Sequence, residues 1–397
     1  MQTSSGLPSA PAGHPGVVVI GGGVIGSAVA THLRLGGAGV TVVERDPTYA
    51  TASSSLSASS IRQQFSQPVN IALSQYGIAF LRDAAAHLSV DGDAPALALR
   101  EPGYLYLAGP AGVDRLQANH AVQRASGVQV ALLDPTALRA RFPWLNTDGV
   151  ALGSLGLDGE GWFDGPALAA AFRRKARSLG AAWVHNEAVA LERDGPRVAA
   201  VRLRDGTRIP CGAVVNAAGP HARAVAAMAG VALPVEARRR CVFVFTCPDA
   251  LPGCPLVIGT TGVWWRPEGD RFIAGWSPPD DAEDFGLDVD HALFDEVIWP
   301  ALAARVPAFE RVRGAGAWAG HYEFNTFDHN ALLGPHPDVP NLHFANGFSG
   351  HGMQQAPGVG RGIAELVLHG AYRTLDLSAL SVARVAAGRP LLERNVI

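Results

Sequence analysis

The chain has 397 residues, of which 48% are hydrophobic and 17% are charged, and its formal net charge is −3. This length allows two or three domain-sized units, each with a substantial core. The near balance of charge leaves no basic field that would attract nucleic acid. The sequence also lacks any run of about 18 apolar residues, which argues against a membrane span.

Residues 1–15 and the four cysteines give information about targeting and redox environment. Residues 1–15 have neither a basic start nor an apolar stretch, so we expect a disordered tail and no signal peptide. Cys211, Cys241, Cys247 and Cys254 form no CxxC pair, so neither zinc nor a redox dithiol is indicated and we expect no metal site. Free thiols favour a cytoplasmic protein.

A strand, a glycine turn, a helix and a second strand are predicted at the start of the chain. They are, in order, residues 17–20, the glycines Gly21, Gly23 and Gly26, residues 24–35 and residues 40–44. In this context the G-x-G-x-x-G pattern is typical of dinucleotide binding. The glycines let backbone amides approach a pyrophosphate at the helix N-terminus.

Glu44 ends the second of these strands. A carboxylate there can accept hydrogen bonds from ribose hydroxyls and repels a 2′-phosphate, which disfavours NADP. NAD and FAD both fit this unit, and the motif alone does not separate them.

The rest of the chain is predicted to mix helices and strands. The main elements are a helix over 69–88, a strand over 103–108, a helix over 166–179, strands joined by turns at Asp194-Gly195 and Asp205-Gly206, and a parallel-type strand over 341–345. The nucleotide-binding unit is therefore interrupted, and the C-terminal part of the chain supplies its last strand and helix.

Glycines gather again in "NGFSGHG", residues 346–352, just before a predicted helix. Glycine is used where φ must be positive or where bare backbone approaches another group closely. A connecting loop and a loop against a flat ligand edge both fit this pattern.

Three motifs in order, "GGGVIG", "VVNAAGPHA" (residues 214–222) and "GFSGHG", resemble the D-amino-acid oxidase superfamily of FAD-dependent flavoproteins. This group includes sarcosine, dimethylglycine and glycine oxidases and dehydrogenases, and the resemblance covers nearly the whole chain after residue 15. "SIRQQFS" and "GFSGHG-x-QQAPG" are most similar to a subgroup that contains a mitochondrial flavoprotein associated with complex I assembly. The resemblance selects FAD over NAD.

The resemblance implies an α/β plus α+β fold, with a glutathione-reductase-type FAD-binding Rossmann domain and an antiparallel-sheet domain that caps the flavin. We expect the FAD-binding domain to comprise residues 16–90, 158–235 and 320–397, and the capping domain to comprise 91–157 and 236–319.

The expected cofactor residues, from the glycine motif and from the resemblance, fall into five groups. They are Gly21, Gly23, Val24, Ile25, Gly26 and Glu44 of the first unit; Arg45 and Val189 near the adenine; Ser53 and Ser54 near the pyrophosphate; Ser59, Ser60, Ile61, Ala217, Ala218 and Gly219 along the flavin; and Gly347, Gly350, His351, Gly352, Met353 and Gln354 at its pyrimidine edge. The family's flavin-linking Cys and His are missing, so noncovalent FAD is expected.

Arg62 stands where sarcosine oxidases hold the substrate carboxylate, although an interdomain salt bridge would also explain it. Gln354 occupies a position at which those enzymes carry a lysine, which indicates a weaker clamp or another substrate. Further candidates beside the flavin are His321, Tyr322, Trp264 and His351. Neighbouring strand positions face opposite ways, so only one of Trp264 and Trp265 can face it.

The resulting hypothesis is an FAD-dependent oxidoreductase that oxidises a secondary amine or N-alkylated amino acid by hydride transfer to flavin N5. The chain's single lysine, Lys175, is expected to face solvent, which favours a dehydrogenase that passes electrons to a quinone or an electron-transfer protein. Arg266 or a protonated His321 could instead supply the cation that an oxidase needs. A D-amino-acid or 2-hydroxy-acid dehydrogenase and an FAD-containing assembly protein with little turnover are the alternatives.

Overall fold

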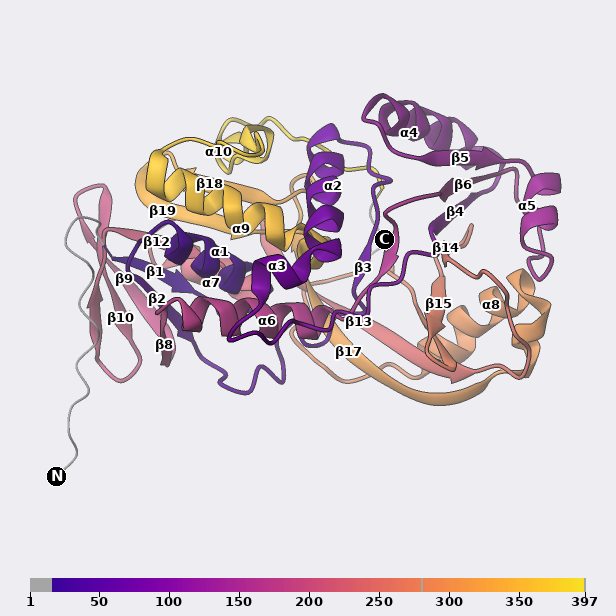
Figure 1. Cartoon of the computed structure of the whole chain (residues 1–397), viewed down its shortest axis with the longest axis horizontal. Coiled ribbons are helices and arrows are strands. Elements are labelled where there is room, and N and C mark those ends of the chain that lie inside the picture. Colours follow the sequence, from indigo (N-terminus) through magenta and orange to yellow (C-terminus); the bar gives the residue numbers. More distant parts are fainter. Residues whose placement is uncertain (1–15, 280, 396–397) are drawn as a thin grey trace.

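Two large sheets organise the chain, and they lie side by side (Figure 1). The computed structural model describes residues 16–279 and 281–395, so the tail predicted for residues 1–15 lies outside the described part. One sheet is mainly parallel and the other mainly antiparallel. This arrangement confirms the predicted combination of a Rossmann-type domain with an antiparallel-sheet domain.

The parallel sheet has six strands and is covered on both faces. Its order is β18 (Leu332–His336), β19 (Val339–Asn346), β12 (Ala213–Asn216), β1 (Val17–Ile20), β2 (Val40–Glu44) and β8 (Ala182–His185), with only β18 antiparallel to its neighbour. Val17 and Val19 pack towards three helices, α1 (Val24–Leu35), α6 (Gly165–Ser178) and α9 (Gly352–His369). Val18 and Ile20 pack towards the other face. Burial on both sides explains why these strands are continuous apolar runs.

The opposite face of the parallel sheet is covered by a small sheet and a short helix. These are β9 (Ala188–Asp194), β10 (Arg197–Leu203), β11 (Arg208–Pro210) and α7 (Ala222–Ala227). The hairpins turn at Gly195 and Gly206, which have φ of +57° and +89°. Both predicted turns are therefore confirmed, and glycine supplies the left-handed backbone that they need.

The antiparallel sheet has eight strands, and only its β14–β4 pair is parallel. The order is β17 (Arg313–Asn325), β13 (Val235–Thr246), β16 (Arg271–Gly275), β15 (Trp264–Glu268), β14 (Leu256–Ile258), β4 (Tyr104–Ala108), β6 (Leu152–Gly156) and β5 (Val130–Leu133). Helices α4 (Val113–Ala125), α5 (Pro135–Arg141) and α8 (Trp299–Arg305) pack around it. The proposed domain boundary at residue 320 falls within β17, and the division into domains stays a prediction.

The segment between the sheets contains α2 (Pro68–Arg82), α3 (Ala84–Leu88) and a two-stranded ladder of β3 (Ser60–Ile61) with β7 (Gly161–Trp162). The single helix predicted over 69–88 is wrong, because Asp83 has φ −114° and ψ 28° and separates α2 from α3. The last short helix is α10 (Ala383–Ala386).

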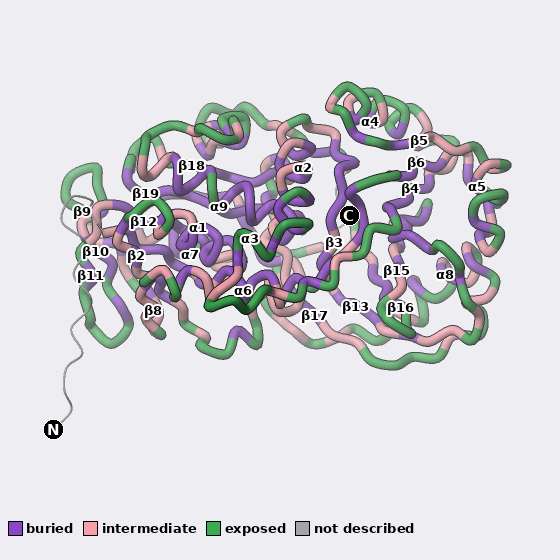
Figure 2. Tube along the Cα trace, in the orientation of Figure 1, coloured by how far each residue is buried: buried purple, intermediate pink, exposed green. Residues whose placement is uncertain are grey.

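Helices α1 and α9 cross at unusually short range. A Cβ added to Gly360 of α9 would lie 2.6 Å from Ala28 Cβ and 2.7 Å from Ala28 C. Figure 2 shows α9 buried along most of its length, in agreement with the buried residues of its central turns. The absence of a side chain at Gly360 therefore lets the two helix backbones approach.

We predict that Gly360→Ala destabilises the fold by roughly 1–3 kcal/mol, because the contact is with backbone atoms that have no room to move. Chemical or thermal unfolding measures the change. Gly314→Ala is the control, since a Cβ there meets nothing within 4 Å. Equal stabilities for the two variants would contradict the interpretation of the crossing.

Candidate cofactor and substrate site

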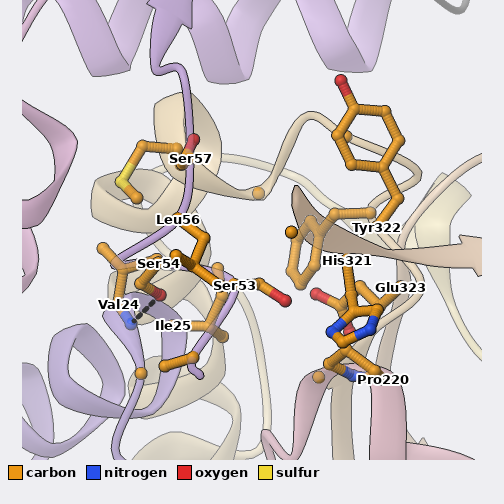
Figure 3. Close-up of a pocket in the computed structure, with 18 of the residues that line it drawn as sticks. Val24, Ile25, Ser53, Ser54, Leu56, Ser57, Pro220, His321, Tyr322 and Glu323 are labelled. Atoms are coloured by element: carbon orange, nitrogen blue, oxygen red, sulfur yellow. Dashed lines mark hydrogen bonds between the residues drawn. The ribbon is translucent and has the colours of Figure 1, made fainter. Parts of the chain in front are cut away.

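A cavity of about 520 Å³ opens between the two sheets, and residues from both units line it. The parallel unit contributes the start of α1, the end of β2, the loop 51–60 and residues 217–221. The antiparallel unit contributes β13, β14, β15 and β17, and the cavity also reaches the start of α9. Figure 3 shows Val24, Ser53 and Ser54 facing His321, Tyr322 and Glu323 across it.

The loop before α1 is packed too closely for any residue but glycine. A Cβ on Gly21 would lie 2.3 Å from Ala217 O, and a Cβ on Gly26 would lie 1.9 Å from Gly21 O. Gly26 does not border the cavity, so its role is to seat the helix against the loop. Gly21 has φ +100° and does border the cavity, which leaves bare backbone facing it.

Two serines line the cavity beside the N-terminus of α1. Ser54 Oγ accepts a hydrogen bond from Val24 N at 2.9 Å, the dashed line in Figure 3. Ser53 Oγ is buried, and it has no hydrogen-bond partner in the described part of the chain. A helix N-terminus with free N–H groups beside an unpartnered hydroxyl fits a pyrophosphate.

Glu44 borders the same end of the cavity. Its Oε2 accepts from Gly22 N at 2.7 Å and its Oε1 accepts from Asp46 N at 2.9 Å. Each carboxylate oxygen keeps a further lone pair, so the group can still accept from ribose hydroxyls. Arg45 Nη2 lies 2.5 Å from His221 Nε2, and burial together with Arg45 lowers the pKa of His221 to about 4.

The glycine loop before α9 approaches an aromatic ring. Gly350 has φ +93°, and a Cβ there would lie 2.5 Å from Tyr322 Cε2. Gly350 therefore has both features that require glycine, a positive φ and a close approach to another group. Helix α9 starts at Gly352 and borders the cavity with Met353 and Gln354, so its first N–H groups are available at this end.

Arg62 is a buried cation at the wall of the cavity, with 2% of its surface exposed. Its Nη2 lies 2.9 Å from His351 Nε2 and also donates to Asn395 O. Its guanidinium carbon lies 4.5 Å from the centre of the Phe65 ring. Arg62 forms no ion pair with any residue in the described ranges, and its buried Nε has no partner there. The contacts therefore do not include the interdomain salt bridge considered above.

His351 is neutral in this environment, because burial and the charge of Arg62 hold its pKa well below the usual range. A guanidinium only donates, so Nε2 of His351 accepts and the ring proton resides on Nδ1. Gln354 Oε1 accepts from Arg62 N at 2.9 Å. In this structure Gln354 thus holds the backbone of Arg62.

The sheet face above the cavity carries Tyr104 and Leu256, which the sequence analysis did not select, and Arg266, which it named as a possible replacement for a lysine. Tyr104 of β4 pairs with Leu256 of β14. Both residues line the cavity wall, together with Arg266 of β15. Arg266 forms an ion pair with Glu268 and donates to Ala58 O at 2.5 Å. The alternation of "YLY" could have placed Tyr104 on a sheet face, but its parallel partner β14 lies about 150 residues later in the sequence.

Strand alternation places only one of the two neighbouring tryptophans of β15 at the cavity. Trp264 borders the cavity, whereas Trp265 is 1% exposed and packs in the core on the other side of the sheet.

Strand β17 contributes His321 and Glu323 to the cavity wall. His321 Nε2 lies 3.1 Å from Gly286 O. The partly buried Glu323, also missed by sequence analysis, accepts from Gly347 N at 3.1 Å, and desolvation raises its pKa to about 8.

Most of the predicted site residues are brought together by the fold. The cavity is bordered by Gly21, Gly23, Val24, Ile25, Glu44, Arg45, Ser53, Ser54, Ser59, Ser60, Arg62, Ala217, Ala218, Gly219, Trp264, His321, Tyr322, Gly350, His351, Gly352, Met353 and Gln354. Gly26, Ile61, Val189 and Gly347 do not border it. Val189 is 40% exposed, and the preceding residues 186–188 border the cavity instead.

Within the described residues no helix is long and apolar enough to cross a membrane, and no cluster of three His, Cys, Asp or Glu side chains could hold a metal ion. Lys175 is only half exposed, and its Nζ donates to Ser89 O at 2.9 Å. The expectation that this lysine faces solvent freely is therefore corrected.

Residues 16–366 match the family of FAD dependent oxidoreductases. The chain is 44% identical to FAD-dependent oxidoreductase domain-containing protein 1 of Xenopus laevis, over 96% of this chain and 84% of that protein. It is 28% identical to human mitochondrial sarcosine dehydrogenase, over 89% of this chain and 40% of that protein.

Among solved structures, glycine oxidase from Geobacillus kaustophilus has a similar fold. The TM-score is 0.80 at 25% identity, over 94% of this chain and 99% of that chain. The chain belongs to the D-amino-acid oxidase family of FAD-dependent oxidoreductases, and FAD is its cofactor.

We predict that Glu44→Ala raises the dissociation constant of FAD by about tenfold to a hundredfold, since charge-assisted hydrogen bonds contribute roughly 1.5–3 kcal/mol. Fluorescence titration of the apoprotein measures this affinity. Glu192→Ala, which removes a carboxylate paired with Arg202 and Arg208 away from the cavity, is the control. Unchanged affinity in the Glu44 variant would remove Glu44 from the cofactor site.

Proposed function

We propose that this protein oxidises a secondary amine or an N-alkylated amino acid by hydride transfer to N5 of FAD. The observation that carries the proposal is Arg62, a guanidinium buried in the cavity wall without a carboxylate partner in the described part of the chain. A buried charge without a counter-ion is costly. A substrate carboxylate at Arg62 would supply the missing counter-ion.

Bound FAD would supply the two-electron acceptor, and the chain would hold it at three places. The N-terminus of α1 and Ser53 would bind the pyrophosphate, and Glu44 would bind the ribose. The first turn of α9 would place N–H groups and the positive end of its dipole against the pyrimidine edge. This charge arrangement favours an electron-rich ring and so supports transfer towards the flavin.

The substrate's own groups would be fixed by the opposite wall. Arg62 has an unpartnered Nε to donate to a carboxylate, and Phe65 and His351 hold its guanidinium in place. Tyr104 and Trp264 would pack against the amine and keep water away. Because hydride transfer from a neutral amine needs alignment and no protein base, a neutral His351 is compatible with the reaction.

We also propose that the FAD is held without a covalent bond. Cys241 of β13 borders the cavity, but it is 5% exposed and packs in the hydrophobic core cluster of the antiparallel sheet. His321 Nε2 already has Gly286 O as a neighbour at 3.1 Å. Neither side chain is set up as a flavin nucleophile.

The named relative gives the substrate class some support. Human sarcosine dehydrogenase is named for sarcosine, which is an N-methylated amino acid with a carboxylate and a secondary amine. The same relative is named mitochondrial, and the cytoplasmic location expected from free thiols stays a prediction. An assembly protein with little turnover is the competing proposal, and it requires no ligand at Arg62.

Anaerobic mixing with a panel of secondary amines and N-alkylated, D- and 2-hydroxy acids tests the proposal. We predict that N-alkylated amino acids bleach the flavin, and that Arg62→Ala lowers kcat/KM for them by tenfold to a hundredfold with an intact flavin spectrum. Arg62→Lys keeps the charge but lacks the planar guanidinium, so its kcat/KM should lie between the values of the parent protein and of Arg62→Ala. Bleaching by none of the panel would favour the assembly role.

We further propose a dehydrogenase that passes electrons to a quinone or an electron-transfer protein. Oxygen reduction begins with an anion beside the flavin, which a free fixed cation stabilises. Lys175 is bonded to Ser89 O and does not border the cavity, and the charge of Arg266 is paired with Glu268.

The reduced enzyme should therefore react slowly with oxygen. Stopped-flow reoxidation of photoreduced protein in air-saturated buffer measures the rate, and the oxidation of a soluble quinone serves as the comparison. Reoxidation by oxygen as fast as by the quinone would identify an oxidase instead.

A further inference from the structure

We propose that the segment Leu391–Asn395 supports the substrate site from outside the cavity and that Glu393 is a positioning residue, which holds the carbonyl of Asn395 on Arg62. The inference rests on the proposed role of Arg62 as the carboxylate anchor. It goes beyond that role because the orientation of the Arg62 guanidinium would depend on residues 391–395, which are distant from Arg62 in sequence.

Glu393 is 1% exposed, and its carboxylate is surrounded by neutral donors. Oε1 accepts from Ser66 N at 2.8 Å, from Ser66 Oγ at 2.6 Å and from Asn395 N at 3.0 Å. Oε2 accepts from Asn70 Nδ2 at 2.9 Å. Four hydrogen bonds to a buried carboxylate make a specific attachment, in contrast to a surface charge that solvent satisfies.

Asn395 forms further hydrogen bonds, to Gln64 and to Arg62 at the cavity wall. Its Nδ2 donates to Gln64 O at 2.6 Å, and its carbonyl oxygen accepts from Arg62 Nη2. The segment is thus bonded to residues 62, 64, 66 and 70, along the whole connection from β3 into α2. Figure 1 shows the C-terminal end of the chain beside β3.

These contacts orient the guanidinium. Nη2 of Arg62 carries two hydrogens, and His351 Nε2 and Asn395 O are acceptors for them. With Nη2 engaged, Nε and Nη1 are the donors left for a ligand. Arg62 borders the cavity and residues 391–395 do not, so the segment supports the guanidinium from the side away from the ligand. Loss of one acceptor would free the guanidinium to adopt other orientations, and a ligand would then have to restrict them.

The test is a titration of the holoenzyme with acetate and benzoate, unreactive carboxylates, followed by the change in flavin absorbance. We expect Glu393→Ala to raise their dissociation constants roughly tenfold, as for one lost hydrogen bond to a charged group. The FAD content should remain that of the parent protein, and with a substrate KM should rise more than kcat falls. Glu393→Gln, which keeps the shape but replaces one acceptor oxygen, should show a smaller rise.

Arg394→Ala is the matched control, because Arg394 lies in the same segment, is exposed and forms no ion pair within the described residues. Asn395→Ala removes the bond to Gln64 while Glu393 stays, and it serves as the second variant if Glu393→Ala does not fold. Unchanged carboxylate affinity in a folded Glu393→Ala protein would overturn the inference alone. Failure of the parent protein to bind any carboxylate would instead overturn the proposed role of Arg62. Loss of folding or of FAD in every Glu393 and Asn395 variant would show a structural role and reject the proposal.

Discussion

The close crossing of α1 and α9 is the contact on which the site depends. Gly360 brings the second helix against Ala28 of the first, so the two N-termini reach the same cavity. Each N-terminus supplies free N–H groups and a positive dipole end. In the proposed binding mode, the N-terminus of α1 faces the pyrophosphate and the N-terminus of α9 faces the flavin edge. A wider crossing would move one of these donor sets relative to the other.

The electrostatics of the cavity differ between its two ends. The carboxylate of Glu44 lies beside the start of α1, where ribose hydroxyls need an acceptor. At the other end the charged group is Arg62, and it is held by neutral acceptors, His351 and a backbone carbonyl. These acceptors are neutral, and the carboxylate of Glu393 acts on Arg62 from a distance without forming an ion pair, so a donor face of the guanidinium remains for an anionic ligand. Glu323, whose raised pKa keeps it largely protonated near neutral pH, adds little negative charge to this wall.

Local sequence patterns predicted the parts of the fold in which local geometry dominates. The first strand, helix and second strand have the predicted bounds, and residues 348–352 of "GFSGHG" border the cavity just before and at the start of α9. Helix 69–88 was mispredicted because Asp83 interrupts it by a backbone conformation that composition does not reveal. Tyr104 and Glu323 were missed because their positions depend on which distant strands pair with β4 and β17. Val189 is 40% exposed and does not border the cavity, and its predicted backbone contact with the adenine stays a prediction.

The attachment of Asn395 to Arg62 joins positions separated by 333 residues, and it has a consequence for biosynthesis. A chain growing on the ribosome exposes Arg62 early, with its aromatic neighbours Phe65 and Tyr104 soon after. Its two acceptors, His351 and Asn395, come from the last part of the chain. A nascent polypeptide in which residue 395 has not yet left the ribosome therefore carries an incompletely oriented arginine, and the contacts of Arg62 cannot be completed before that residue emerges.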